Sequence, residues 1–265
     1  MRPAAVLCLW QRELLEGQRR WTALVLDLAF GALNLIVFFF IARSVGRPSR
    51  QLLDGAPGYF AFAAVGIALM LVVQSAAGQQ VSRVRREQLT GTLEAVVAQP
   101  VSLAELAFGL TGAGYLLAAV RALLYLTFAV LALGLDASRA DALGVVVIVV
   151  LACVSFMAVA IALLALALVV RGGESLVRVM LVAMVFLSGA YFPVARLPHA
   201  LGELARFMPP RIALDGLRRA LFRGHGWVLD AGWLALSTAV VLPLSLLALA
   251  AALASLKRRA KLTTS

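Results

Sequence analysis

Six long apolar runs constrain the fold of this chain more than any other feature of its sequence. They cover approximately residues 22–42, 57–80, 104–134, 142–170, 176–194 and 231–256. A helix needs roughly 20 residues, at about 1.5 Å each, to cross the hydrocarbon of a bilayer, and each run approaches or exceeds that length. Because lipid cannot hydrogen-bond to an exposed backbone, every run has to be helical. The sequence therefore predicts an all-α integral membrane protein with six transmembrane helices, in a single domain over residues 1–265.

The overall composition excludes soluble and nucleic-acid-binding proteins. Hydrophobic residues make up 63% of the chain and charged residues 14%, with a mean hydropathy of +0.97. Soluble domains contain about 45–50% apolar and about 25% charged residues. The net charge of +11 does not indicate nucleic-acid binding, because the basic residues are scattered between apolar runs and form no basic helix face with interleaved aromatics. Anionic lipid headgroups are the expected partner of these arginines.

The distribution of basic residues predicts the orientation in the membrane. Six spans place both termini on one side. With the N-terminus inside, the inside segments hold 13 basic residues and the outside segments 10, of which six lie in residues 195–230. Without that long segment the count is 13 against 4. Because short cytoplasmic segments are enriched in Lys and Arg, both termini are predicted to be cytoplasmic.

Two further segments have amphipathic patterns. Residues 1–20 place Leu7, Trp10 and Leu14 near one face and arginines on the other, which predicts a helix lying in the cytoplasmic interface. Residues 195–230 have apolar residues at helical spacing on both sides of Pro209-Pro210: Leu197, Leu201, Leu204, Met208, Ile212, Leu214, Leu217 and Leu221. Because the prolines break the helix, this segment predicts a hairpin of two short helices, re-entrant where protein buries it.

The segment 81–100, between the second and third runs, leaves two interpretations open. Leu89, Leu93, Val96 and Val97 lie on one face of a helix that Pro100 would end. An amphipathic helix of this kind is a docking surface for the groove of a partner protein. Alternatively, the segment is a solvated turn whose charges only enforce the topology. Periodicity alone does not separate these two interpretations.

Two motifs, in this order, resemble the ABC-2 type permease family. The first is Glu87-Gln88-Leu89-Thr90-Gly91-Thr92-Leu93-Glu94 followed by Pro100, which is similar to the first cytoplasmic loop of these permeases. The second is Ser188-Gly189-Ala190-Tyr191-Phe192-Pro193 followed by Leu197-Pro198, Pro209 and Arg218, which is similar to the end of the fifth span and the extracellular hairpin. Gln99 departs from the pattern, because a threonine often precedes the proline. The resemblance extends over the whole chain.

The resemblance implies a permease that exports an amphipathic compound (a drug, an antibiotic, a lipid or a glycolipid) across a bacterial cell membrane. Such permeases dimerise, and each copy binds a separate ATPase subunit that carries ATP and magnesium, so this chain would hold no cofactor. The implied ATPase-coupling residues are Arg86, Glu87, Gly91, Thr92, Leu93, Glu94, Arg171, Gly173 and Glu174. The implied residues of the hairpin and its gate are Gly189, Phe192, Pro193, Pro209 and Pro210.

Arg121 is the one charge deep inside a predicted span. An arginine at a helix centre costs about 2.5–3.5 kcal/mol to insert, so its side chain should face protein or water. It either lines a substrate pathway, together with Asn34, Gln74 and Tyr125, or is a snorkelling or structurally paired arginine. The second interpretation is favoured, because the run is long and its register is open.

Other transport and enzyme classes fit less well. The alternative is an ion-coupled secondary transporter of a small hydrophobic substrate, but such a relay needs acidic or histidine side chains inside the membrane and the only spanning carboxylate is Asp27, near a span end. The chain has no P-loop motif, no metal-ligand spacing and no cluster of catalytic residues. We therefore predict no catalytic, cofactor or metal site, and a transport subunit without its own ATPase.

Overall fold

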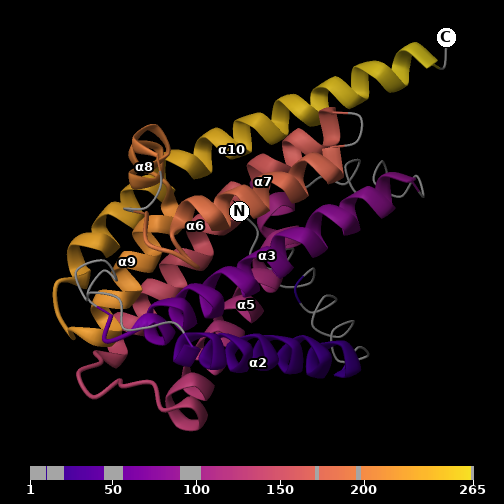
Figure 1. Ribbon diagram of the computed structural model, residues 1–265. Coiled ribbons are helices and arrows are strands. Elements are labelled where there is room, and N and C mark those ends of the chain that lie inside the picture. The colour runs from indigo at the N-terminus through magenta and orange to yellow at the C-terminus, as the bar shows by residue number, and fades with distance from the viewer. Residues whose placement is uncertain are drawn as a thin grey trace.

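The computed structural model describes residues 10, 21–44, 56–89, 103–170, 173–194 and 198–263. The helices are α2 (Trp21–Ser44), α3 (Tyr59–Leu89), α5 (Leu103–Leu133), α6 (Ala142–Val169), α7 (Gly173–Ser188), α8 (His199–Arg206), α9 (Pro209–Phe222) and α10 (Trp227–Thr263). No strand occurs in these ranges, so the described part of the chain is an all-helical bundle (Figure 1). The predicted interfacial helix over residues 1–20 lies, except for Trp10, outside the described residues.

Within the described residues, five helices are long and apolar enough to cross a membrane: α2, α3, α5, α6 and α10. They coincide with five of the six predicted runs. The remaining run, predicted over residues 176–194, is represented by α7, which has 16 residues and ends at Ser188. At about 1.5 Å per residue it covers roughly 24 Å, less than the hydrocarbon thickness. Five candidate spans are therefore present, and a sixth span stays a prediction.

The end of α7 has a local cause. Gly189 follows the helix with a φ of 76°, a left-handed conformation that stops an α-helix and that glycine adopts at little cost. The predicted end at residue 194 was therefore wrong. The prediction for segment 81–100 also needs a correction, because α3 continues to Leu89 and no separate helix begins at residue 81. Residues 90–100 lie outside the described residues.

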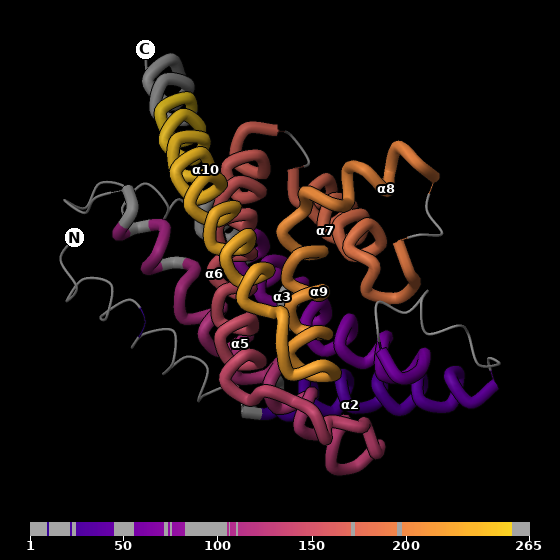
Figure 2. Tube along the Cα trace, turned by 90° about the vertical axis from the view of Figure 1, so that its left-hand side faces the viewer, coloured from indigo at the N-terminus to yellow at the C-terminus, as the bar shows by residue number. Residues whose placement is uncertain are grey.

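Successive long helices run in opposite directions, so the end of one long helix lies at the same end of the bundle as the start of the next. Phe38, near the end of α2, stacks on Tyr191 with ring centroids 5.5 Å apart, and the Tyr59 hydroxyl at the start of α3 donates to the Tyr191 carbonyl at 3.1 Å. The Trp227 indole at the start of α10 donates to Asp141, which caps α6, at 2.8 Å. We call this end of the bundle, where α8 and α9 also lie, the hairpin end (Figures 1 and 2).

The core is formed around α3 and α6. Most residues in the apolar spans of α3 and α6 are buried, whereas few residues in the spans of α2 and α10 are buried. Small side chains allow helices to approach closely in a membrane protein, and α3 has Ala61, Ala63, Ala64 and Ala68 in the core. Gly66 marks the closest approach, because a Cβ atom there would stand 2.1 Å from the Ala190 carbonyl oxygen.

The predicted hairpin is present as two short helices. α9 begins at Pro209, with both prolines in its first turn, where their missing N–H groups cost nothing. The prediction of two short helices broken at Pro209-Pro210 is therefore confirmed. α9 packs against α6 and α10, and also touches α3 and α7, so it belongs to the core. Its re-entry into the bilayer stays a prediction.

Candidate functional site

Four of the predicted coupling residues are described, and they lie at the end of the bundle opposite the hairpin end. Arg86 and Glu87 belong to the last part of α3, and Gly173 and Glu174 begin α7. The others lie outside the described residues: Gly91, Thr92, Leu93, Glu94 and Arg171.

A hydrogen bond joins the two predicted coupling segments. The Ser82 hydroxyl, in the last turns of α3, donates to Glu174 Oε1 at 3.0 Å, and Arg178 donates to the same oxygen. The turn from α6 into α7 is tight, because a Cβ at Gly173 would stand 2.6 Å from backbone atoms of Ala167. The last turns of α3 are therefore hydrogen-bonded to the first turn of α7.

Arg121 is paired. Its Nη1 donates to Asp27 Oδ2 at 3.1 Å, and the two residues are 94 positions apart in the chain. The Tyr125 hydroxyl, one turn along α5, donates to the Asp27 carbonyl at 2.8 Å. Removing one partner of a buried ion pair is costly, because the remaining charge has no compensation. Arg121 therefore has an ion-pair partner, and whether it also lines a substrate pathway stays a prediction.

The other predicted pathway residues separate into two places. Asn34 lies two turns after Asp27 on α2, and its Oδ1 is buried without a donor among the described residues. Gln74 lies on α3 and its Nε2 donates to the Leu181 carbonyl of α7 at 3.4 Å, a long hydrogen bond. The structure therefore brings Arg121 and Tyr125 together with Asp27, and places Gln74 at the contact between α3 and α7.

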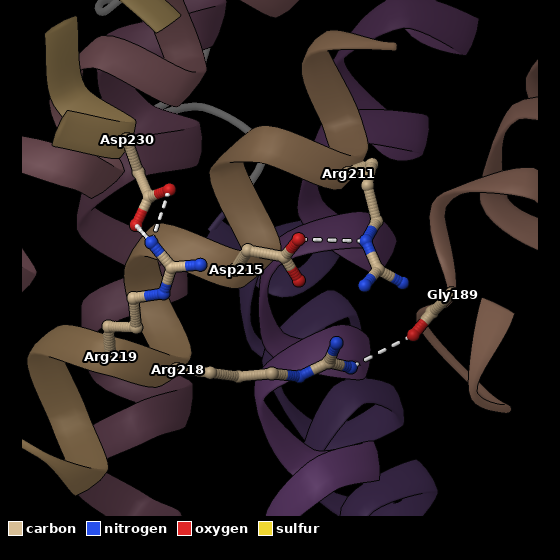
Figure 3. A network of polar contacts seen from close by, with 6 residues as sticks. All are labelled: Gly189, Arg211, Asp215, Arg218, Arg219 and Asp230. Atoms are coloured by element: carbon tan, nitrogen blue, oxygen red, sulfur yellow. Dashed lines mark hydrogen bonds and ion pairs between the residues drawn. The ribbon is translucent and has the colours of Figure 1, made fainter. Parts of the chain in front are cut away.

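The hairpin end contains a network of charged residues, shown in Figure 3. Arg211 donates to Asp215 at 2.8 Å, one turn apart on α9. Arg219 Nη1 donates to both carboxylate oxygens of Asp230 at 2.9 Å, which ties α9 to the start of α10. The first contact lies within α9, and the second holds α9 to α10 independently of its apolar packing.

Arg218 is the most buried charge in the described part of the chain. Its residue exposure is 1%, and its Nη2 donates to the carbonyl oxygens of Gly189 at 2.9 Å and Phe62 at 3.2 Å. Its guanidinium carbon lies 3.6 Å from the centroid of the Phe62 ring, a cation–π contact. One side chain thus connects α9 to α3 and to the end of α7.

Sequence reasoning did not single out Arg218 as a functional residue. The signal was present in the helical spacing, because Arg218 comes four residues after Leu214 and three before Leu221. These positions share one helix face, so the arginine had to lie on the apolar side of α9. The long-range partners, Phe62 and Gly189, could not be read from this spacing.

The predicted gate residues surround the end of α7. A Cβ at Gly189 would stand 2.7 Å from Val194 and 3.0 Å from Arg211, so both its φ and its surroundings require glycine. Phe192 and Pro193 are half-buried, and the Phe192 ring lies 6.1 Å from that of Phe186. Burial also raises the pKa of the neighbouring Tyr191, so its phenol stays protonated. A gate requires these residues to move, and their role as a gate stays a prediction.

Replacing Asp141 by alanine should destabilise the hairpin end. Its side chain caps α6 by accepting from the amides of Leu143 and Gly144, at 3.1 and 3.2 Å, and also accepts from Trp227. Loss of a cap and of one further hydrogen bond costs about 1–3 kcal/mol. We expect a lower thermal unfolding midpoint, followed by tryptophan fluorescence in detergent.

Asp136→Ala, in the same α5–α6 loop, is the matched control for that substitution. Asp136 is exposed, and its contact is local, since its Oδ1 accepts the Ser138 amide at 3.1 Å. Hydrogen bonds from Ser138 hold its pKa below the ordinary value. Its removal should leave the midpoint unchanged, and equal losses for the two variants would contradict the assigned role of Asp141.

Comparison with known proteins gives one family. The family model described as ABC-2 type transporter matches residues 4–222, from before α2 to the end of α9. No curated protein matches the chain.

Proposed function

Because the chain belongs to the ABC-2 type transporter family, we propose that it is the membrane-spanning subunit of an exporter that a separate ATPase subunit drives. The observation that carries this proposal is the family match over residues 4–222, together with the long apolar helices in the same region. ATP and magnesium would be bound by the partner, and the cargo would be an amphipathic compound moved outward across a bacterial cell membrane.

We propose that α7 is the sixth span and that both termini are cytoplasmic. The alternating direction of the long helices supports this arrangement, because α7 then runs antiparallel to α6 like its neighbours. A helix of 16 residues can span where the bilayer thins around it, at a modest cost per ångström of mismatch. The hairpin end would then face the outside, which agrees with the bias of basic residues towards the other side.

Coupling would pass from the ATPase through the end of α3 to the α6–α7 turn. The hydrogen bond from Ser82 to Glu174 supports this route, because it joins the two segments expected to contact the partner. Closing two ATPase subunits would rock these segments as rigid bodies. At the other end of α3, Arg218 and Phe62 would carry the movement to α9.

The dimer and the cargo path would use the outer helices. α2 and α10 leave large apolar side chains exposed, among them Phe30, Phe40, Trp233 and Leu247. In a membrane such faces are covered by lipid or by a second copy of the chain. The cluster of Asp27, Arg121 and Tyr125 supports a path along α2 and α5, since it places polar groups within an otherwise apolar surface.

The proposal is tested by purifying the chain with and without its partner. We expect the isolated chain to hydrolyse no ATP and a separate ATPase to co-purify with it from its native host. Vesicles containing both subunits should transport only when ATP is supplied. ATP hydrolysis by this chain alone, or transport driven by a proton gradient without ATP, would contradict the proposal.

Charge reversal at Glu94 should uncouple the two subunits. Glu94→Lys places a positive charge where the resemblance implies an acidic contact with the ATPase, and removing a buried interfacial charge partner costs about 2–5 kcal/mol. We expect transport and co-purification of the ATPase to fall at least tenfold, while the permease still inserts and migrates as wild type in size-exclusion chromatography.

Glu203→Lys is the matched control for Glu94→Lys. Glu203 lies on α8 at the hairpin end, and its pair with Arg206 is exposed, so the pair contributes little to stability. This variant carries the same change of charge at the opposite end of the molecule. If both variants lose the ATPase equally, the coupling surface has been placed at the wrong end.

A further inference from the structure

The ion pair between Asp27 and Arg121 is buried on one side only. The Arg121 side chain is 11% exposed, whereas the Asp27 side chain is 44% exposed. The carboxylate therefore reaches the outer face of the α2–α5 pair, and the guanidinium lies behind it. Because both residues belong to candidate membrane spans, the molecules that reach this carboxylate come from the bilayer.

The pair also has an unused hydrogen-bonding group. Arg121 Nε is buried and has no acceptor among the described residues. Arg121 as a residue is nine-tenths buried, with an exposure of 9%. Buried polar groups in proteins are nearly always hydrogen-bonded, so an unsatisfied donor beside an exposed carboxylate indicates a polar ligand.

The surroundings of the pair suit an amphiphile. Large apolar side chains close to it in the sequence are exposed on both helices: Leu26 (69%), Phe30 (60%), Val120 (47%) and Leu124 (50%). Asp27 lies near the start of the α2 span and Arg121 about midway along the α5 span, so an amphiphile that contacts the pair does so from within the bilayer.

We propose that Asp27 and Arg121 bind the headgroup of a zwitterionic amphiphile from the bilayer, one that carries a primary ammonium beside a phosphodiester. The ammonium donates to the exposed carboxylate of Asp27, and a phosphate oxygen accepts from Arg121. A quaternary ammonium has no N–H to donate, and a purely anionic headgroup meets the Asp27 charge first. This inference deepens the proposed function, since it names a substrate class for the path along α2 and α5.

The test measures which lipids the purified full chain retains. Native mass spectrometry would follow retention from an equimolar mixture of phosphatidylethanolamine, phosphatidylcholine and phosphatidylglycerol. We expect wild type to retain phosphatidylethanolamine roughly tenfold over the other two lipids, as one additional charge-assisted hydrogen bond allows. Asp27→Asn should abolish this preference.

Thr127→Val is the control for the same bilayer-facing surface. Thr127 is exposed on α5, and its hydroxyl donates to the Leu123 carbonyl of its own helix at 2.9 Å. This variant changes a polar group near the site without touching the ion pair, so the lipid preference should persist.

The double variant Asp27→Arg/Arg121→Asp separates a headgroup site from a purely structural pair. It restores the ion pair, so it should unfold near the wild-type midpoint even if Asp27→Asn does not fold. It also exposes the base in place of the acid, and the preference should shift to phosphatidylglycerol. The proposal is overturned if wild type retains the three lipids in proportion to the mixture, or if Asp27→Asn or the double variant keeps the wild-type preference. Neither ATP nor the partner subunit takes part, so this result and the ATPase co-purification can fail independently.

Discussion

Arg218→Met should lower the stability of the hairpin end more than any other single side-chain truncation considered. The methionine fills most of the volume, but two carbonyl oxygens, of Gly189 and Phe62, lose their shared donor. Each hydrogen bond from a charged group is worth about 1.5–3 kcal/mol, and the cation–π contact with Phe62 adds about 0.5–2 kcal/mol. Relief of the desolvated charge offsets part of this loss.

The expected net loss is about 2–4 kcal/mol, which lowers the thermal unfolding midpoint by roughly 5–15 °C for a domain of this size. Because membrane proteins often unfold irreversibly, variants should be compared at one scan rate by circular dichroism. Arg218→Lys should recover little, since an ammonium does not reproduce the planar contact with the ring and both carbonyls.

Arg223→Met is the control on the same helix. Arg223 is the exposed C-cap residue of α9, and its replacement should change the free energy of unfolding by no more than about 0.5 kcal/mol. If Arg218→Met and Arg223→Met unfold within a degree of each other, Arg218 does not connect α9 to its neighbours.

Gly66→Ala is the second substitution with a large expected effect. The added Cβ would stand 2.1 Å from the Ala190 carbonyl oxygen and 2.7 Å from two further backbone atoms of that residue. Backbone cannot rotate away like a side chain, so α3 and the turn after α7 have to separate. Overpacking of this kind costs about 1–3 kcal/mol and occasionally more. The separation should also break the hydrogen bond from Tyr59 to Tyr191.

Gly78→Ala gives the matched control, because Gly78 lies on the same helix with nothing within 4 Å of an added Cβ. Both substitutions gain the same helix propensity, roughly 0.5–1 kcal/mol, so their difference isolates the clash. We expect Gly78→Ala to unfold at or above the wild-type midpoint and Gly66→Ala clearly below it. Should Gly66→Ala match Gly78→Ala, the close contact between α3 and Ala190 would be refuted.

The helix ends show most clearly how much of the fold could be predicted from the sequence. The run around residues 142–170 was predicted almost to the residue, because hydropathy alone decides where a segment can leave the bilayer. α7 ends earlier than predicted, at Ser188, because the left-handed conformation of Gly189 stops the helix although the apolar stretch continues to Pro193. The segment 81–89 joined α3 for the opposite reason, since nothing in it breaks a helix.

The charged residues show what could not be predicted from the sequence. Arg121 was expected to need a partner, and the cost of a charge in the membrane justified that expectation. The choice of Asp27 depended on how α2 and α5 pack, which no local pattern contains. Arg218 was quoted only as part of a motif, although its spacing on α9 already placed it on an apolar face.

The long apolar runs by themselves determined that this is a membrane protein built of helices, and the two motifs determined its family, which the family match confirms. Both conclusions depend on properties of short segments: lipid forces each apolar run to satisfy its own backbone, and a motif is local by definition. Only the tertiary structure decided that Arg218 reaches Phe62 and Gly189 and that Ser82 meets Glu174. These outcomes depend on which helix faces meet and at what depth, and packing between distant segments sets both.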